Sequence, residues 1–218
     1  MARTLQTEPR ALLAARRVAR PRASRAEDAV AARLDLADAA RKQTRAAPAT
    51  VRITCAVPRP GFVHPASRVD IKAVLAAAGA ESTYGLRCVE LCRASIDRPL
   101  RFARLMVPGR IRLYEQPEPP WRLRGSLRGN AADRLRAAGA RVHHDASVDA
   151  TVVEWPGDAL RRFMLLDVLL HELGHHVLQH HKGKRFATIA RTRDHEAFAD
   201  RHAWRLRERC AAALGADA

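Results

Sequence analysis

The residues most capable of chemistry lie in the segment 170–176, Leu-His-Glu-Leu-Gly-His-His, which contains the pattern H-E-x-x-H. On an α-helix, residues four apart differ by about 40° in direction. His171 and His175 therefore project together and can share one metal ion. Glu172 lies about 100° from His171, beside the two histidines, where a general base would activate a metal-bound water. The segment predicts a metal-binding helix that carries a catalytic carboxylate.

A third ligand is offered by the segment 194–200, Asp-His-Glu-Ala-Phe-Ala-Asp. Glu196 and Asp200 are four residues apart and share one face of a predicted helix. The alanines around them are small, so this helix can pack close to the first one. We expect Glu196 to bind the metal together with His171 and His175, and Asp200 to orient one of the ligand histidines. Gly174 costs helix stability, which is tolerable if another group must approach the backbone there.

Each half of this pattern also has an ordinary structural explanation. The histidines can be solvated, or satisfied within the core, on an amphipathic helix, and the two carboxylates can belong to a solvated helical face. The apolar run 163–170 before the histidines indicates, however, that their helix is largely buried. Two imidazoles at the edge of a buried face need polar partners, and the two halves together favour a metal site.

The motif H-E-L-G-H-H followed by E-A-F-A-D resembles the gluzincin metallopeptidases. Among these it is most similar to the compact ones, the ImmA/IrrE-type, HtpX and CAAX-prenyl endopeptidase families. The resemblance covers about residues 150–210 and implies a zinc ion (Zn²⁺) bound by His171, His175 and Glu196, with Glu172 as general base. Two features depart from these families: the chain has no transmembrane segment, and the residues after Asp200 lack the apolar run expected of ImmA/IrrE-type proteins. The resemblance therefore extends to the superfamily and not to one family.

The 218 residues suffice for one domain with an extension. We expect residues 1–48 to form a basic, Ala/Arg-rich extension, partly disordered, with one helix that begins at the capping box after Ser24. Residues 49–215 should form the zinc-metallopeptidase-like domain. The expected fold class is α+β: a small mixed β-sheet packed on the two zinc-bearing helices.

The net charge of +16 raises the possibility of a nucleic-acid partner. The Arg residues are nevertheless scattered, no basic stripe with interleaved aromatic residues is present, and a biased composition explains the charge equally well. We therefore expect weak, non-specific attraction to polyanions and no specific nucleic-acid binding. No apolar stretch approaches the ~18 residues of a membrane span, so membrane insertion is not expected.

The N-terminus lacks the apolar core of a secretory signal, and the four cysteines suggest a reducing compartment. We expect a cytoplasmic protein, with an organellar transit peptide as the alternative. Cys55, Cys88, Cys92 and Cys210 are expected to be buried structural thiols, with a second metal site as the alternative. Oligomeric state is not predicted.

The remaining patterns predict the elements around the site. Strands are expected at 51–57, 86–91, 101–107, 110–115, 141–145 and 151–155, and helices at 71–78, 127–138, from Asp158 through the zinc motif, and at 193–214. The Pro-rich segment 117–121 should be an extended connector, in which Trp121 is a packing plug and not a lid. His143 and His144 are expected on the surface, and His180 and His181 too far along the helix to reach the metal.

These expectations together predict zinc-dependent hydrolysis of a protein or peptide substrate. The substrate backbone is expected to pair with the strand 151–155, because this strand immediately precedes the zinc helix. The tetrahedral intermediate of peptide hydrolysis carries an oxyanion, which needs a second stabilising group besides zinc. The candidates for this group are Tyr114, His195, His202 and Arg207. Two other classes stay open: a zinc-binding regulatory protein that does not cut its partner, and a basic nucleic-acid-associated module.

Overall fold

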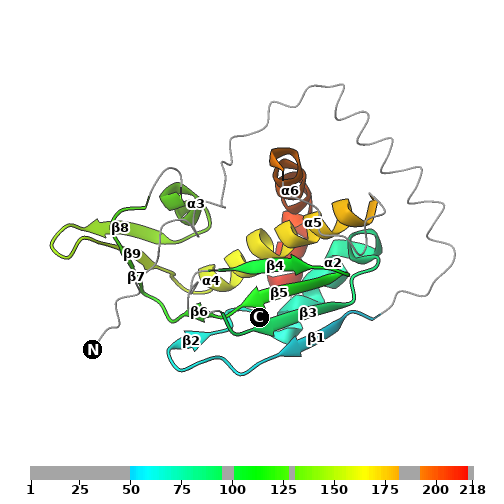
Figure 1. Cartoon of the computed structure of the whole chain (residues 1–218), viewed down its shortest axis with the longest axis horizontal. Helices are drawn as coiled ribbons and strands as arrows, with labels where there is room; N and C mark the ends of the chain where they lie inside the picture. The colour runs from blue at the N-terminus through cyan, green and yellow to red at the C-terminus, as the bar shows by residue number, and fades with distance from the viewer. Residues whose placement is uncertain (1–49, 95–100, 128–130, 182–191, 216–218) are drawn as a thin grey trace.

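The computed structural model describes residues 50–94, 101–127, 131–181 and 192–215. The predicted extension 1–48, with the helix after Ser24, lies outside these residues, as does the side chain of His181. The described chain combines helices with small β-sheets (Figure 1), so the predicted α+β class is confirmed.

The largest sheet has four strands in the order β1-β3-β5-β4. Its strands are β1 (Arg52–Cys55), β3 (Cys88–Cys92), β5 (Arg110–Tyr114) and β4 (Ala103–Met106). The first three are parallel and β4 is antiparallel to β5, so the sheet is mixed, as predicted. Alternate residues such as Val89 and Ile111, both 0% exposed, face the helices. Figure 1 shows the four strands side by side with α2 (Arg68–Thr83) behind them.

A second sheet has the order β7-β9-β8 and is antiparallel throughout. Its strands are β7 (Trp121–Arg124), β9 (Ala150–Glu154) and β8 (Arg141–Asp145), and a small pair joins β2 (Phe62–Val63) to β6 (Gln116–Pro117). The sequence predicted the strand at 141–145 with its observed bounds and the strand at 151–155 one residue too late, but it did not predict that they form a sheet with β7. It missed β7 because the prolines before it suggested a connector.

Trp121 is confirmed as a packing plug. Its side chain is 1% exposed, its indole N–H donates to the Pro117 carbonyl at 2.8 Å, and its ring packs edge-on against Trp155 at 5.2 Å. The exposed neighbours of Trp121 alternate with buried ones along β7. This half-buried pattern is why the segment forms a strand and not a loose connector.

Helix α2 begins at Arg68, three residues before the predicted start at Ile71, and its first turn is closed by a capping box. The Ser67 hydroxyl accepts a hydrogen bond from the Asp70 N–H at 3.1 Å, and the Asp70 carboxylate accepts from the Ser67 N–H at 2.7 Å. The predicted end at Gly79 is wrong. Gly79 adopts a left-handed φ of 82° and kinks the chain, after which the helix resumes to Thr83.

The helix that carries the zinc motif is interrupted. It comprises α4 (Ala159–Arg162), a π-helical segment η2 (Phe163–Leu169) and α5 (Leu170–His181). Asp158 stands before α4 as predicted, but its side chain makes no capping hydrogen bond. π-Helical segments are rare and frequently lie beside functional sites, and this one ends at the residue before α5.

The remaining helices are α3 (Ala131–Ala137) and α6 (Arg193–Gly215). Helix α6 packs against both α5 and α2. Leu165, Leu169 and Leu173 are fully buried in the core between these helices and the four-stranded sheet. The two segments predicted to hold the metal are therefore neighbouring, packed helices, and both are anchored by the same core.

All four cysteines are free thiols. Cys88 and Cys210 are buried, as expected, whereas Cys92 is half-buried and Cys55 is exposed. The expectation of buried thiols is thus correct for two of the four. In the described part of the chain, no helix is long and apolar enough to cross a membrane.

Candidate metal centre

Helix α5 carries the two histidines of the predicted site on one face. The Nε2 atoms of His171 and His175 lie 3.0 Å apart, with the rings nearly perpendicular at 85°. The His175 side chain is 5% exposed and that of His171 is 20% exposed. One turn of helix therefore aims two imidazole nitrogens at a single, largely buried point, as the four-residue spacing predicts.

Helix α6 brings Glu196 to the same point. Its carboxylate oxygens lie 3.2 Å from Nε2 of His171 and 3.5 Å from Nε2 of His175. Bonds of 2.0–2.1 Å in a tetrahedral zinc site imply ligand atoms roughly 3.3 Å apart. Among the described residues, these three form the only group of three or more His, Cys, Asp or Glu side chains whose ligand atoms converge in this way, all within 4.8 Å. These three side chains could hold one metal ion, and two imidazoles with one carboxylate are ligand types that zinc accepts.

The close approach of the two helices depends on Gly174. A Cβ atom at this position would lie 2.7 Å from Cα and 3.0 Å from the carbonyl oxygen of Ala199. The backbone of α6 thus occupies the space that any other side chain on α5 would need. The prediction that small residues allow close packing of the two helices is confirmed at this crossing.

Asp200 holds the other nitrogen of His171. Its Oδ1 lies 2.8 Å from Nδ1 of His171. Burial by itself lowers the pKa of His171, but its hydrogen bonds to Asp200 and Glu196 outweigh burial and raise the pKa to about 9. Burial raises the pKa of Glu196, but its contacts with the two histidines outweigh this and hold the pKa well below its ordinary value. The surroundings of His171 therefore favour a positive charge, which a proton or a metal ion can supply.

Glu172 lies beside the three candidate ligands and points to the four-stranded sheet. Its side chain is buried at 5% exposed, and one carboxylate oxygen accepts a hydrogen bond from the Leu105 N–H of β4 at 2.8 Å. Glu172 is thus held between the candidate metal site and a strand edge. This contact could not be predicted from the sequence, because the observed register, in which Leu105 lies opposite Ile111, is what turns the Leu105 N–H to the outer edge.

The expected substrate-binding strand is wrong. Residues 151–155 were chosen as an edge strand, but β9 is the central strand of its sheet and pairs with β7 and β8 on its two sides. Its backbone groups are already used, so it cannot accept a further strand. In the described chain, the strand edge that reaches the site is that of β4, which pairs only with β5 and contacts α5.

Two of the four candidates for oxyanion stabilisation are engaged elsewhere. Arg207 forms an ion pair with Asp167 of η2. Tyr114 shares its face of the sheet with Cys92 and not with the helix-facing residues, and the Arg101 guanidinium lies 5.7 Å from the centre of its ring. His195 and His202 lie on α6, His202 being stacked on Phe198 at 6.2 Å. These two histidines stay candidates.

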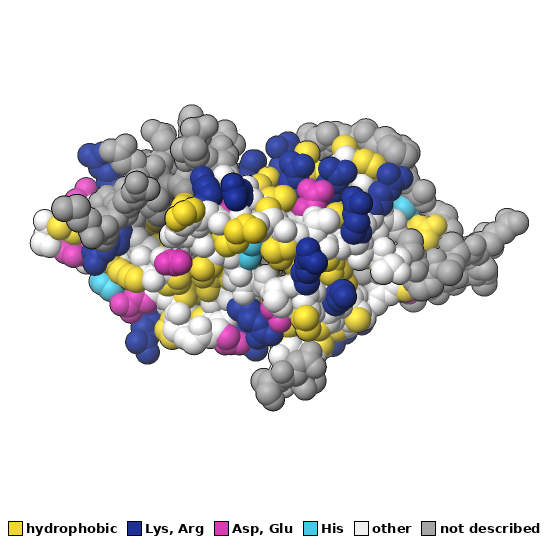
Figure 2. All heavy atoms as spheres, turned by 90° about the horizontal axis from the view of Figure 1, so that it is seen from below, with side chains coloured by type: hydrophobic (Ala, Val, Ile, Leu, Met, Phe, Trp, Pro, Cys, Tyr) yellow, Lys and Arg dark blue, Asp and Glu magenta, His cyan; other side chains and the backbone are white. Residues whose placement is uncertain are grey.

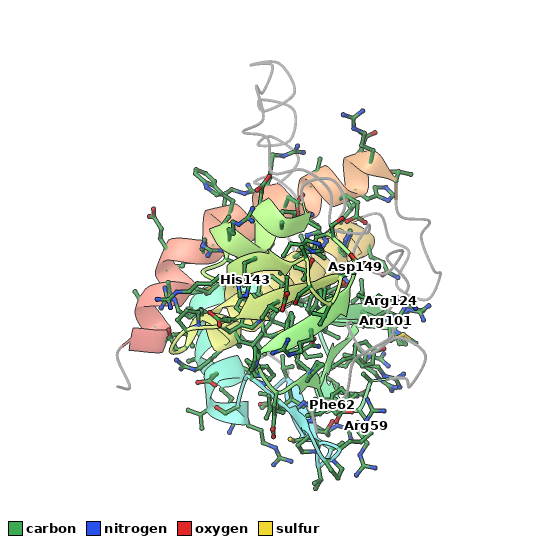
Figure 3. The ribbon with its side chains drawn as sticks, turned by 90° about the vertical axis from the view of Figure 1, so that its left-hand side faces the viewer. Arg59, Phe62, Arg101, Arg124, His143 and Asp149 are labelled. Atoms are coloured by element: carbon green, nitrogen blue, oxygen red, sulfur yellow. The ribbon has the colours of Figure 1, made fainter. Side chains whose placement is uncertain are left out.

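The other histidines lie apart from this cluster. His176 contacts the carbonyl of Tyr84 through Nε2 at 3.0 Å, and the ring of His180 packs edge-on against Tyr84 at 4.8 Å. His180 therefore faces the loop after α2, as expected from its distance along the helix. His143, labelled in Figure 3, and His144 lie on β8 and are exposed, so the expectation that they lie on the surface is confirmed.

Comparison with models of known protein families found no match, and comparisons with curated proteins and with solved structures found none either. The case for a function therefore depends on the geometry of this chain.

Proposed function

We propose that this protein is a zinc metallopeptidase whose metal is held by His171, His175 and Glu196. The observation that carries the proposal is the convergence of these three side chains, from two separate helices, within 4.8 Å. Asp200 supports the proposal because it fixes the ring of His171 from the opposite nitrogen. A solvated acidic pair or a satisfied core histidine requires no such convergence.

When bound, zinc polarises the scissile carbonyl and lowers the pKa of water. Glu172 acts as general base and accepts the proton of the attacking water. It then delivers this proton to the leaving amine. Its position beside the ligands, without belonging to the converging set, suits this role.

The substrate peptide would lie along β4 as an additional strand. β4 is favoured over β9 because its outer edge pairs with no other strand within the described chain and because Glu172 reaches that edge at the Leu105 N–H. Main-chain hydrogen bonds would hold the peptide extended and present one peptide bond to Glu172.

The test begins with the metal content of the protein purified without chelator, where about one zinc per chain is expected. Peptides from a cell extract are then incubated with wild type, with Glu172→Gln and with Glu208→Gln. Glu208 is an exposed residue of α6 and provides a matched control. Glu172→Gln should keep its zinc but lose cleavage by orders of magnitude, whereas Glu208→Gln should cut like wild type.

Two outcomes would contradict the proposal. Equal cleavage by wild type and Glu172→Gln would exclude Glu172 as the base. Tight zinc binding by both without any cleavage would instead support a regulatory zinc-binding protein on this fold.

A further inference from the structure

The outer edge of β4 pairs with no other strand in the described chain, and its Leu105 N–H donates to Glu172. The Tyr114 N–H donates to the Phe102 carbonyl at 2.9 Å, which makes these two residues a hydrogen-bonded pair. Such pairs alternate in an antiparallel ladder, so Arg104 also bonds to β5. Ala103 and Leu105 therefore turn their N–H and C=O groups outward. The contact of the Leu105 N–H with Glu172 agrees with this assignment.

The side chains of β4 alternate between two faces. Those of Ala103 and Leu105 pack against the core. That of Arg104 is exposed on the opposite face of the sheet, where Figure 1 shows no described helix over the strands. Figure 3 places Arg101 on this same side, away from α6. A peptide added beside β4 would thus place every second side chain on the face of Arg104.

This face of the sheet is rich in arginine and has a single carboxylate among the strand residues described. Its ionisable strand side chains other than cysteine and tyrosine are Arg52, Glu90, Arg104, Arg110 and Arg112. The two oxygens of Glu90 are used by Arg110 at 3.2 Å and by Arg112 at 2.9 Å.

Arg104 stands directly opposite Arg112 on the neighbouring strand. Like charges in this relation repel, and Glu90 relieves the repulsion only at Arg112. Within the described residues, Arg104 has no ion pair. An acidic group on the other side of Arg104, along the outer edge of β4, would neutralise its charge.

From this pattern we infer that the peptide bound along β4 carries an acidic side chain opposite Arg104. This inference rests on the proposed peptidase function and specifies its substrate class. In an antiparallel arrangement the residue opposite Arg104 forms a non-hydrogen-bonded pair, with Cα atoms about 4.5 Å apart and side chains close together. An Asp or Glu there can meet the guanidinium through paired hydrogen bonds. In the bound peptide, this acidic residue is next to the residue opposite Leu105, whose N–H contacts Glu172. The preference for an acid is therefore expected next to the peptide bond that Glu172 can reach.

The chain's own N-terminal extension does not suit this edge. Residues 1–48 contain 11 Lys and Arg against 5 Asp and Glu, a net charge of +6. Apart from the stretch 27–38, which has four acids and one arginine, this extension carries the sign of Arg104 and would be repelled, whereas an acidic peptide is attracted. Charge complementarity therefore favours a separate, acidic substrate.

Peptides with alternating residues test the inference without knowledge of the register. Thr-Asp repeats of eight residues place an acid on one face throughout, and Thr-Asn and Thr-Lys repeats serve as neutral and basic probes. Binding of labelled peptides to zinc-loaded Glu172→Gln is measured by fluorescence anisotropy at physiological salt. The Thr-Asp peptide should bind about 5-fold more tightly than the Thr-Asn peptide.

Variants of Arg104 assign the effect to one side chain. Adding Arg104→Glu should weaken Thr-Asp binding by about 10-fold and improve Thr-Lys binding, and Arg104→Gln should lie between. Arg52→Glu is the matched control, because Arg52 is exposed on the same face at the opposite edge of the sheet. It should change affinity less than 2-fold.

Equal binding of Thr-Asp and Thr-Asn, or an equal loss with Arg52→Glu and Arg104→Glu, would overturn the inference. Failure of the proposed function gives a different result: wild type cuts nothing while the acidic peptides still bind at Arg104. If wild type cuts a peptide library without a preference for acids within two residues of the cut, the peptidase stands and the acidic preference is wrong.

Discussion

The neighbours of the His171 imidazole hold it in the orientation that a ligand of the proposed metal ion needs. Nδ1 faces the Asp200 carboxylate at 2.8 Å, so Nδ1 carries the proton that this contact requires. Nε2 is then directed to the point shared by His175 and Glu196. Because the tautomer and the ring orientation are both set by Asp200, the metal affinity of the site should depend on a residue that is not itself a ligand.

Asp200→Asn tests this dependence. Asn can still accept the hydrogen bond from His171 but supplies no negative charge, so zinc affinity should fall by roughly 10–100-fold. Competition with a chelator of known affinity measures the change. Asp194→Asn is the control, because Asp194 is exposed in the first turn of the same helix. If both variants bind zinc like wild type, Asp200 does not tune the site.

At the scale of the elements, the site depends on how closely α5 and α6 cross. The backbone of Ala199 lies where a side chain at position 174 would be. Backbone atoms cannot rotate away as a flexible side chain can, so the two helices are in contact at their closest possible distance. Glu196 lies three residues before Ala199, about one turn away, and any shift of α6 moves this ligand.

Gly174→Ala should therefore reduce both stability and zinc affinity. Overpacking at a contact of this kind costs about 1–3 kcal/mol, although alanine favours the helix itself. Urea unfolding measures the first effect and chelator competition the second. Gly215→Ala is the control, since a Cβ there meets nothing within 4 Å. Unchanged zinc affinity in a folded Gly174→Ala protein would show that the site tolerates a wider crossing.

Asp70 of α2 forms an ion pair with Arg161 of α4 at 2.7 Å. This ion pair leads to a prediction of how the stability of the fold depends on pH. Burial raises the pKa of Asp70, but its hydrogen bonds with Arg161 and Ser67 outweigh burial and leave the pKa below its ordinary value. A carboxyl with a depressed folded-state pKa stabilises the fold above its unfolded-state pKa of about 3.9 and loses this contribution as pH falls through the folded value.

Asp70→Asn should accordingly lower the free energy of unfolding at pH 7, and its difference from wild type should shrink as pH falls from about 5 to below 3. Urea unfolding across this range measures the difference. Asp133→Asn, at a pair on α3 whose carboxylate is 77% exposed, should show little effect at any pH. A difference for Asp70→Asn that stays constant with pH would contradict the argument.

The residues of the candidate site could be predicted from local sequence patterns. The order of the strands could not, because it depends on tertiary contacts. The four-residue spacings of the histidines and of Glu196 and Asp200 are properties of single helices, so the sequence was enough to place them on common faces. Sheet order is decided by contacts between distant segments. For this reason the sequence predicted the strand at 151–155 but not that β9 is central, and it predicted the hairpin but not that β4 reaches Glu172.

At the scale of the whole molecule, the chain carries a net charge of +16. Figure 2 shows Lys and Arg side chains scattered over one face, with acidic and apolar side chains between them. Such a distribution attracts polyanions in general, and the described residues of this face form no contiguous basic groove that would follow a phosphate backbone. The local pattern at Arg104 differs from this background, because it adjoins one strand edge and Glu172.

The background charge leads to the last prediction, on nucleic acid. Binding to random duplex DNA should be weak and should fall steeply between about 50 and 200 mM salt, since each phosphate contact releases counterions. Removing zinc should change it little, because the proposed metal ion would add only a small part of the net charge of +16. Arg104→Glu should weaken it no more than Arg52→Glu, in contrast to their effects on acidic peptides. Fluorescence anisotropy with duplexes of different sequence measures all three. Tight, sequence-selective binding at physiological salt, independent of zinc, would instead make nucleic acid the functional partner of this fold.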